Sequence, residues 1–404
     1  MAPPPSPPLD LIADVAIEIF LRFPPDEPEH LFRAAFVCKH WLRVLCDPVF
    51  RRRYRAFHGA PPLLGLLHRR QLRHGDPAAR FASTTSMPDF PHPGSGGRRT
   101  RPLDCRHGRV LVHMLEKEDV DLLVWDPVTG DRHAFPQPDD MELLIYAAAV
   151  FCAVEGCDHL DCHGGPFGVI FVSTDAHDEI IIASVYSSET GAWSVPVSLD
   201  DGSEFYAKHG QDAIEDELYY IPYVQPRRAA IIRDDIYFTL RRDNAIIKYD
   251  RGLNCLSMIN PLSPNVNNRR ISLMVMEDSS LGFACIEGSS LFLWSRKVNS
   301  EGAPEWVQIR VLELEATIPI DNVDYVMPET TMSIDHLEFG RSVVGFAEGV
   351  DVIFISTDLG LFTIEIKSGK VKKVDKPGVY YSVLPYMSFC TPDHGKLLSI
   401  ARTQ

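Results

Sequence analysis

The sequence predicts an α + β multidomain protein in which a small all-α domain precedes a large, propeller-like all-β domain. Its 404 residues exceed the length of one ordinary domain. Apolar residues recur at helical spacing within 9–58, whereas short β-type runs separated by polar turns fill 103–404. Residues 1–8 are expected to form a disordered Pro-rich tail, and residues 59–102 a connector between the domains.

The first predicted helix begins near Leu11 and ends before Pro24. A residue that precedes a proline is driven out of the α region, so the pair Pro24-Pro25 stops the helix. One apolar face of the helix follows the spacing i, i+3, i+7 and i+11, and consists of Ile12, Val15, Ile19 and Phe23.

Capping signals place the helices that follow. Asp26, with Glu29 three residues later, resembles a capping box, and apolar residues then mark a helical stretch over 31–45. Asp47 and Pro48 predict a further start, with Asp47 as the N-cap and Pro48 at the first helical position. We therefore expect four short helices before residue 59.

The pattern changes to β-strands from about Cys105. Upstream, residues 87–102 hold four prolines and three glycines, which favours a linker. Downstream, no long amphipathic helix interrupts the β-type runs, which indicates an all-β region. The clearest runs cover 109–115, 121–125, 168–173, 180–186, 229–240, 245–249, 291–294, 350–356 and 361–366.

A weak internal repeat favours a β-propeller. Each copy is a strand ending in an aromatic or aliphatic residue, followed by a polar turn that contains glycine. Gly130, Gly191 and Gly252 are spaced 61 residues apart, and Gly369 ends a further copy. This period is somewhat longer than the roughly 40–50 residues of familiar propeller blades. Radial closure protects strand edges, which favours a propeller; two β-sandwiches with coincidental turn spacing are the alternative.

Composition and charge exclude several classes of function. Hydrophobic content of 45% and charged content of 24% are typical of a soluble globular protein. Residues 1–80 carry 12 Lys or Arg and 8 Asp or Glu, whereas the remainder carries 28 and 47. This acidic bulk argues against a nucleic-acid partner, since affinity for phosphate backbones comes mainly from clustered Lys and Arg.

Neither a membrane role nor secretion is expected. The longest apolar run, over 143–154, is too short to span a bilayer, and the N-terminus lacks the features of a signal peptide. Nine scattered cysteines, an odd number, fit reduced thiols in the cytoplasm or the nucleus.

Catalytic motifs are absent from the sequence. It contains no G-x-x-x-x-G-K-[ST] phosphate loop, no G-x-G-x-x-G, no H-E-x-x-H and no G-x-S-x-G elbow. We therefore expect no enzymatic activity and no cofactor. Three arginine pairs could clamp a phosphate or carboxylate if loops brought them to one face, or could be exposed charges at strand ends. These pairs are Arg227-Arg228, Arg241-Arg242 and Arg269-Arg270.

One segment concentrates possible metal ligands. Cys157, His159, Cys162 and His163 follow Cys152 within 12 residues, and thiolates with imidazoles are the ligands of tetrahedral zinc. No second paired knuckle closes a familiar zinc finger. The favoured interpretation is a polar structural loop between strands without a metal; zinc and redox chemistry are the alternatives.

Three segments of the helical region occur in order: EIFLRFP at 18–24, VCKHW at 37–41 and DPVF at 47–50. They continue as RRRYRAFH at 51–58 and PPLLG at 61–65. Together they resemble the F-box motif, particularly that of the large F-box family of grasses. DCRHGR at 104–109, WDPVTG at 125–130 and CDHLDCHGGPF at 157–167 also look like that family's F-box-associated β-domain. The last likeness favours a shared structural loop over a metal site.

The resemblance implies a non-catalytic adaptor of a Skp–cullin–F-box ubiquitin ligase. The helices would bind the Skp-type subunit, and through it the cullin, while the β-domain would recruit a protein substrate. One departure is Ile12, where the family usually has proline. By position, the Skp-facing or supporting residues would be Leu11, Val15, Ile19, Pro24, Val37, Cys38, Lys39 and Trp41.

Two other functions stay open. A propeller-type interaction scaffold outside any ligase would be favoured if no Skp-type protein bound the chain. An enzyme would be favoured if the purified protein held stoichiometric zinc, and if changing Cys157 or Cys162 removed both the zinc and a measurable turnover.

Overall fold

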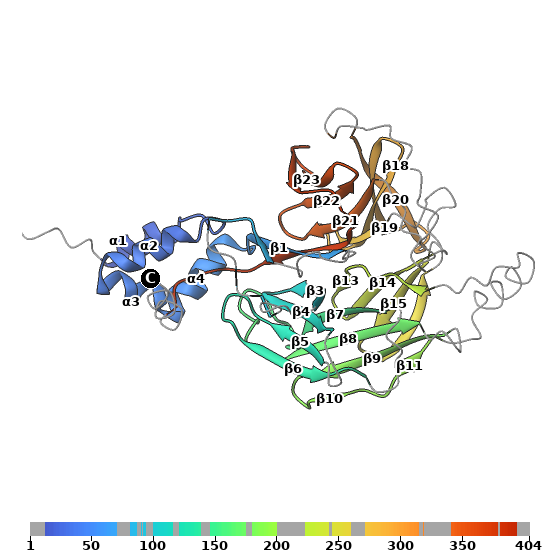
Figure 1. Ribbon diagram of the computed structural model, residues 1–404, viewed down its shortest axis with the longest axis horizontal. Coiled ribbons are helices and arrows are strands. Elements are labelled where there is room, and N and C mark those ends of the chain that lie inside the picture. The colour runs from blue at the N-terminus through green and yellow to red at the C-terminus, as the bar shows by residue number, and fades with distance from the viewer. Residues whose placement is uncertain are drawn as a thin grey trace, which may run out of the picture.

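Four short helices precede a six-bladed β-propeller in the computed structural model (Figure 1). The predicted fold class is therefore confirmed, and the alternative of two β-sandwiches is wrong. The structure describes residues 13–70, 81–86, 90, 92–93, 100–115, 121–138, 146–174, 180–199, 223–241, 245–259, 271–314, 318, 341–378 and 380–393. The predicted tail over 1–8 and Leu11 lie outside these residues.

The helical module, residues 13–58, contains α1 (Ala13–Phe20), α2 (Glu29–Val37), α3 (Lys39–Cys46) and α4 (Pro48–His58). The predicted start of α4 is confirmed, because the Asp47 carboxylate accepts a hydrogen bond from the Val49 N–H at 2.7 Å. The predicted capping box is wrong, since Pro28 is the N-cap of α2. The stretch 31–45 is divided at Cys38, whose backbone is extended.

Five blades follow the chain in order. Blade 1 consists of β3 (Thr100–Arg106), β4 (Arg109–Met114), β5 (Asp121–Trp125) and β6 (Arg132–Pro136). Blade 2 consists of β7 (Tyr146–Cys152), β8 (Phe167–Thr174), β9 (Ile181–Ser187), β10 (Ala192–Trp193) and β11 (Val197–Ser198). Blade 3 consists of β12 (Tyr223–Val224), β13 (Ala230–Ile232), β14 (Asp235–Arg241), β15 (Ile246–Asp250) and β16 (Cys255–Ile259). Blade 4 consists of β17 (Ser272–Val275), β18 (Leu281–Glu287), β19 (Ser290–Val298) and β20 (Pro304–Glu313). Blade 5 consists of β21 (Ser342–Ala347), β22 (Val352–Thr357), β23 (Gly360–Glu365) and β24 (Val371–Asp375).

The sixth blade is built from both ends of the described chain. Its strands are β1 (Leu63–Arg70), β2 (Phe81–Ser83) and β25 (Tyr380–Met387), with β1 in the middle. β1 runs antiparallel to β25, and β25 lies between the inner strands β21 and β3. The predicted connector over 59–102 is therefore corrected: part of it forms the blade that closes the ring, and the β-domain begins before residue 103.

The repeated turns join β5 to β6, β9 to β10, β15 to β16 and β23 to β24. The backbone N–H of Gly130, Gly191 and Gly369 each donates to the carbonyl four residues earlier, at 2.8, 2.9 and 2.8 Å. These three glycines have φ of 81°, 70° and 71°, a region that favours glycine. In the third copy Asn254, not Gly252, takes the positive φ. The repeat thus marks the same position in blades 1, 2, 3 and 5.

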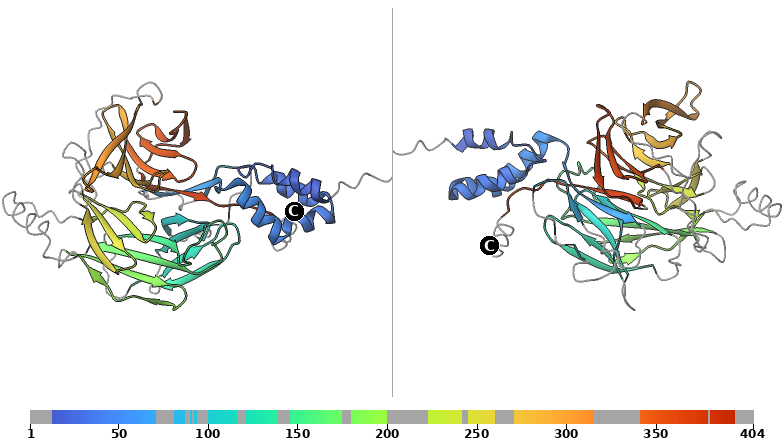
Figure 2. Two further views of the ribbon diagram at one scale, coloured as in Figure 1. Left: turned by 180° about the vertical axis from the view of Figure 1, so that it is seen from behind. Right: turned by 45° about the horizontal axis from the view of Figure 1, so that its top comes forward.

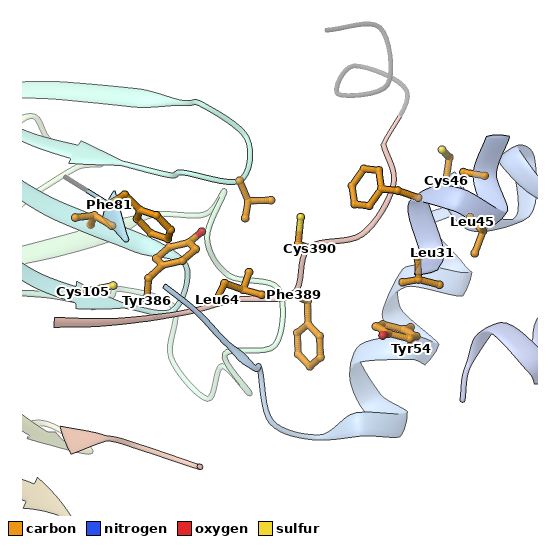
Figure 3. Packing of buried hydrophobic residues seen from close by; sticks show 14 of the residues in the cluster. Leu31, Leu45, Cys46, Tyr54, Leu64, Phe81, Cys105, Tyr386, Phe389 and Cys390 are labelled. Atoms are coloured by element: carbon orange, nitrogen blue, oxygen red, sulfur yellow. The ribbon is translucent and has the colours of Figure 1, made fainter. Parts of the chain in front are cut away.

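The helical module and the propeller share one hydrophobic core. Figure 3 shows Phe389 and Cys390, which follow β25, between Tyr54 of the helical module and Tyr386 of the propeller. The Tyr54 ring meets the Phe389 ring edge to face, with centroids 6.2 Å apart. Three views place the helices at one side of the propeller (Figures 1 and 2). The two parts are therefore packed together, and no open linker separates them at this contact.

Among the described residues, no helix combines the length and apolar character that crossing a membrane requires.

Candidate functional site

Large apolar side chains are exposed on the helical module. Val15 and Ile19 of α1 are 47% and 44% exposed, and Phe36 and Val37 at the end of α2 are 60% and 64% exposed. Val15 and Ile19 lie one turn apart on the same side of α1. The adjacent face of α1 is buried, because Ala16 and Phe20 are 1% and 2% exposed. These four residues are called the apolar helix surface below.

The other predicted partner-binding residues lie around this surface. Pro24, Cys38 and Lys39 are exposed, whereas Trp41 is half-buried and packs edge to face on Phe20 at 5.1 Å between ring centroids. Cys38 also has a local role, because its Sγ accepts the Trp41 N–H at 3.4 Å.

Phe36 was not among the predicted partner-binding residues. The apolar run over 34–37 could have indicated that one of its residues is exposed, because four consecutive residues cannot all face the same side of a helix.

The β7–β8 loop, residues 153–166, is the part of the propeller that contacts the helical module through Asp161 and Leu160. Asp161 of this loop forms an ion pair with the buried Arg55 of α4. Leu160 packs against the shared core. On the same side, Arg51 of α4 pairs with Asp393 at 2.8 Å. These contacts and the shared core define the helix–propeller junction.

A pocket of about 270 Å³ opens at this junction. Its lining comes from the segment after α4, from four propeller loops (β3–β4, β7–β8, β12–β13 and β21–β22) and from the end of β25. Representative lining residues are Ala60, His107, His159, Arg228, Glu348 and Met387.

Four charged side chains connect three blades beside this pocket, and three of them, Arg106, Arg228 and Glu348, line it. Asp104 and Arg106 belong to β3 of blade 1, Arg228 precedes β13 of blade 3, and Glu348 follows β21 of blade 5. Arg228 contacts Glu348 at 2.9 Å and Asp104 at 3.5 Å, while Arg106 contacts Asp104 at 3.1 Å and Glu348 at 3.4 Å. Asp104 also accepts the Val150 N–H of β7 at 3.0 Å. We call these four side chains the charge network.

The alternative of exposed charges at strand ends is wrong for Arg227 and Arg228. Arg228 binds carboxylates, as one interpretation expected, but they are Asp104 and Glu348 of the propeller itself. Arg227 donates to the Ile271 and Val343 carbonyls at 2.6 and 2.9 Å, so both side chains join blades. The side chain of Arg241, and the residues Arg242, Arg269 and Arg270, lie outside the described part of the structure.

The predicted metal-ligand segment brings four donor atoms together. The donor atoms of Cys152, Cys157, His159 and Cys162 all lie within 4.8 Å of one another. His163, a predicted candidate, belongs elsewhere, because it contacts Asp126 at 2.6 Å and Asp161 at 3.3 Å. None of the nine cysteines, all of which the structure describes, forms a disulfide.

A family model described as "F-box protein AT5G49610-like, beta-propeller" matches residues 102–393. The chain belongs to this F-box protein family. The match covers blades 1 to 5 and β25, and it begins after the helical module, β1 and β2.

Solved structures that resemble this F-box-family chain are distant. A nidogen/laminin complex chain is 11% identical, with 81% of this chain and 99% of that chain covered and a TM-score of 0.41. TolB from Acinetobacter baumannii is 12% identical, with 83% and 70% covered and a TM-score of 0.43. The WD40 domain of SCAP from fission yeast is 13% identical, with 71% and 57% covered and a TM-score of 0.34. No curated protein matches the chain.

Acid should weaken this F-box-family propeller through Glu348. Burial raises the pKa of Glu348, but Arg228 and Arg106 outweigh burial and lower the pKa to about 2 from its usual 4.5. The ion pairs therefore contribute fully above pH 4.5, and their contribution is lost as the pH falls through 2. The lost contribution amounts to about 3 kcal/mol of unfolding free energy.

The measurement is urea unfolding of the wild-type protein and of Glu348→Gln between pH 7 and pH 2. The stability advantage of the wild type should shrink toward the acid end, whereas exposed Glu301→Gln should track the wild type throughout. A constant advantage across the range would show that Glu348 is not held ionised by the arginines.

Proposed function

We propose that this chain is the substrate-recognition adaptor of a Skp–cullin–F-box ubiquitin ligase. The helical module would act as the F-box and bind the Skp-type subunit, and the propeller would recruit a protein substrate. The apolar helix surface is the observation that carries the proposal, because it is placed on the four-helix module of a chain whose propeller belongs to an F-box family.

The apolar helix surface fits a partner protein on physical grounds. A fully buried Val, Ile or Phe side chain is worth roughly 1.5–3 kcal/mol, and these four keep about half of that surface in water. Each of the two helices contributes a pair of exposed large apolar side chains, and exposed apolar patches with a polar rim are typical of interaction sites. Lys39 and His40, both exposed, stand beside Val37 at the start of α3 and supply part of that rim.

The propeller suits substrate recruitment without chemistry of its own. The four side chains of the charge network pair with one another within and between blades, so they stabilise the ring. We propose a non-catalytic role in the cytoplasm or the nucleus. The adaptor would contribute proximity, which makes ubiquitin transfer to a bound substrate effectively intramolecular.

The test is co-expression with a Skp-type subunit, followed by size-exclusion chromatography and calorimetry. Ile19→Asp and Val37→Asp should each weaken the 1:1 complex about 100-fold, since each removes buried apolar contact and places a charge in the interface. Both residues are exposed in the isolated chain, so the variants should fold.

Matched controls are Val195→Asp and Leu253→Asp on the propeller, where the side chains are 81% and 75% exposed. These variants should bind the Skp-type subunit like the wild type. If Ile19→Asp and Val37→Asp also bind normally, the surface is assigned wrongly. If the folded wild type binds no Skp-type protein, the chain is an interaction scaffold outside a ligase.

A further inference from the structure

We propose that Cys152, at the end of β7, and Cys157, His159 and Cys162, in the β7–β8 loop, bind one Zn²⁺ ion as a closed structural site. The inference concerns blade 2 and does not rest on the proposed function. It revises the metal-free loop that the sequence favoured, and of the five possible ligands in the segment it leaves out His163.

The four donor atoms have the separations of a tetrahedral site. All lie within 4.8 Å of one another, and the Cys162 Sγ is 3.6 Å from the His159 Nδ1. Zinc binds thiolate sulfur at about 2.3 Å and imidazole nitrogen at about 2.0–2.1 Å, so the S···N edge of a tetrahedron is about 3.6 Å. The observed separation therefore matches that edge.

The ligand types favour zinc and a structural role. Three thiolates with one imidazole form a common structural zinc set, whereas oxygen ligands would suit magnesium or calcium. Four protein ligands also fill the tetrahedron and leave no position for water or substrate. Cys152 and Cys162 are 6% and 7% exposed, which places the site inside the loop.

The backbone of the loop is shaped around the ligands. His159 has a φ of 58°, an uncommon value for a residue with a side chain, and Gly156 has a φ of 65°. The His159 N–H donates to the Cys157 Sγ at 3.4 Å. This hydrogen bond would orient the sulfur and stabilise its negative charge when it binds the ion. Such a conformation persists when the surroundings hold it in place, and a bound ion would do so.

Neighbouring side chains complete the site. Three thiolates and Zn²⁺ carry a net charge of −1, and the buried guanidinium of Arg109 lies 4.0 Å from the Cys162 Sγ. Arg109 also donates to the Cys162 carbonyl and, at 2.7 Å, to the Gly165 carbonyl. The His107 ring stacks on the His159 ring at 3.9 Å and fixes its plane. Orientation of ligands by a second layer of residues is usual for metal sites.

Zinc at this position would order the helix–propeller junction. Between the ligands, Leu160 packs on the shared core and Asp161 pairs with Arg55 of α4. The ion would close the loop that carries these contacts, so its loss should loosen the attachment of the helical module.

The test uses the full chain, purified under reducing conditions without an affinity tag that binds metals. Elemental analysis and native mass spectrometry should give one zinc per chain. Added Co²⁺ should replace it and produce the intense visible absorption of a tetrahedral thiolate site. Cys157→Ser and His159→Ala should lose the zinc, and limited proteolysis should cut the β7–β8 loop faster in these variants.

Cys255→Ser is the matched control, because Cys255 is also partly exposed but lies in blade 3, outside the site. This variant should keep one zinc per chain. Cys157 is half-buried, and circular dichroism should show that Cys157→Ser keeps its strands. A reduced wild type that binds neither Zn²⁺ nor Co²⁺ would overturn the proposal. Zinc retained by both ligand variants, or a disulfide between Cys152 and Cys162 in the native protein, would overturn it as well.

Discussion

Replacing Arg228 with methionine is expected to destabilise the propeller by about 3–5 kcal/mol, the usual cost of breaking a buried ion pair by removing one partner. The side chain of Arg228 is 11% exposed, and that of Asp104 is fully buried. The change would leave Glu348 paired with Arg106 alone, at the longer distance of 3.4 Å. It would also remove the hydrogen bond from Arg228 to the Cys105 carbonyl at 3.2 Å. Urea unfolding monitored by tryptophan fluorescence measures the loss.

Two further variants separate the loss of charge pairing at Arg228 from the loss of packing. Arg53→Met is the matched control, because Arg53 forms an exposed ion pair with Glu18, and a change within about 0.5 kcal/mol is expected. The double variant Arg228→Met with Glu348→Gln should lose less than the two single losses combined, since it removes a cation and its anion together. Additive losses would contradict a shared network.

Tyr54→Ala is expected to cost about 3–5 kcal/mol and to uncouple the helical module from the propeller. The side chain is 1% exposed in the shared core, stacks against Phe50 at 6.0 Å and meets Phe389 at 6.2 Å between ring centroids. Removing a buried aromatic side chain of this size loses its transfer free energy and leaves a cavity. Hydrogen exchange should show α4 and the residues after β25 opening together.

Two changes in the same helix serve as controls. Tyr54→Phe keeps the ring and loses only the hydrogen bond from the hydroxyl to the Phe23 carbonyl at 2.9 Å, a cost of about 1 kcal/mol. Phe57→Ala removes a ring that is 56% exposed and should change stability by about 0.5 kcal/mol or less. If Tyr54→Ala left the exchange of α4 unchanged, the junction would not depend on this core.

Local signals in the sequence were sufficient for much of the secondary structure. Asp47 and Pro48 start α4 because a side-chain cap and a fixed φ act within a few residues. Gly130, Gly191 and Gly369 mark equivalent turns because each turn needs a residue with positive φ, and glycine adopts that conformation without help from distant residues. The third copy differs, because Asn254 and not Gly252 takes the positive φ there.

Which face of α1 is buried depended on how the helix packs against the rest of the helical module. Val15 and Ile19 form an apolar stripe at the predicted spacing, yet Ala16 and Phe20 are the residues that enter the core. Both stripes satisfy helical periodicity, so only the positions of the other helices select the buried one. The exposed stripe is consequently available to a partner.

The sequence by itself determined the order of elements, the helical module and the all-β class with its repeated turns. The tertiary structure alone decided that β1 closes the ring against β25, that Arg228 meets Asp104 and Glu348 across blades, and that His163 lies outside the cluster of donor atoms. Periodicity and capping depend on neighbours within about one turn or one strand. Ring closure, ion pairing and ligand geometry instead depend on residues that approach only when the chain has folded, at separations that no local pattern records.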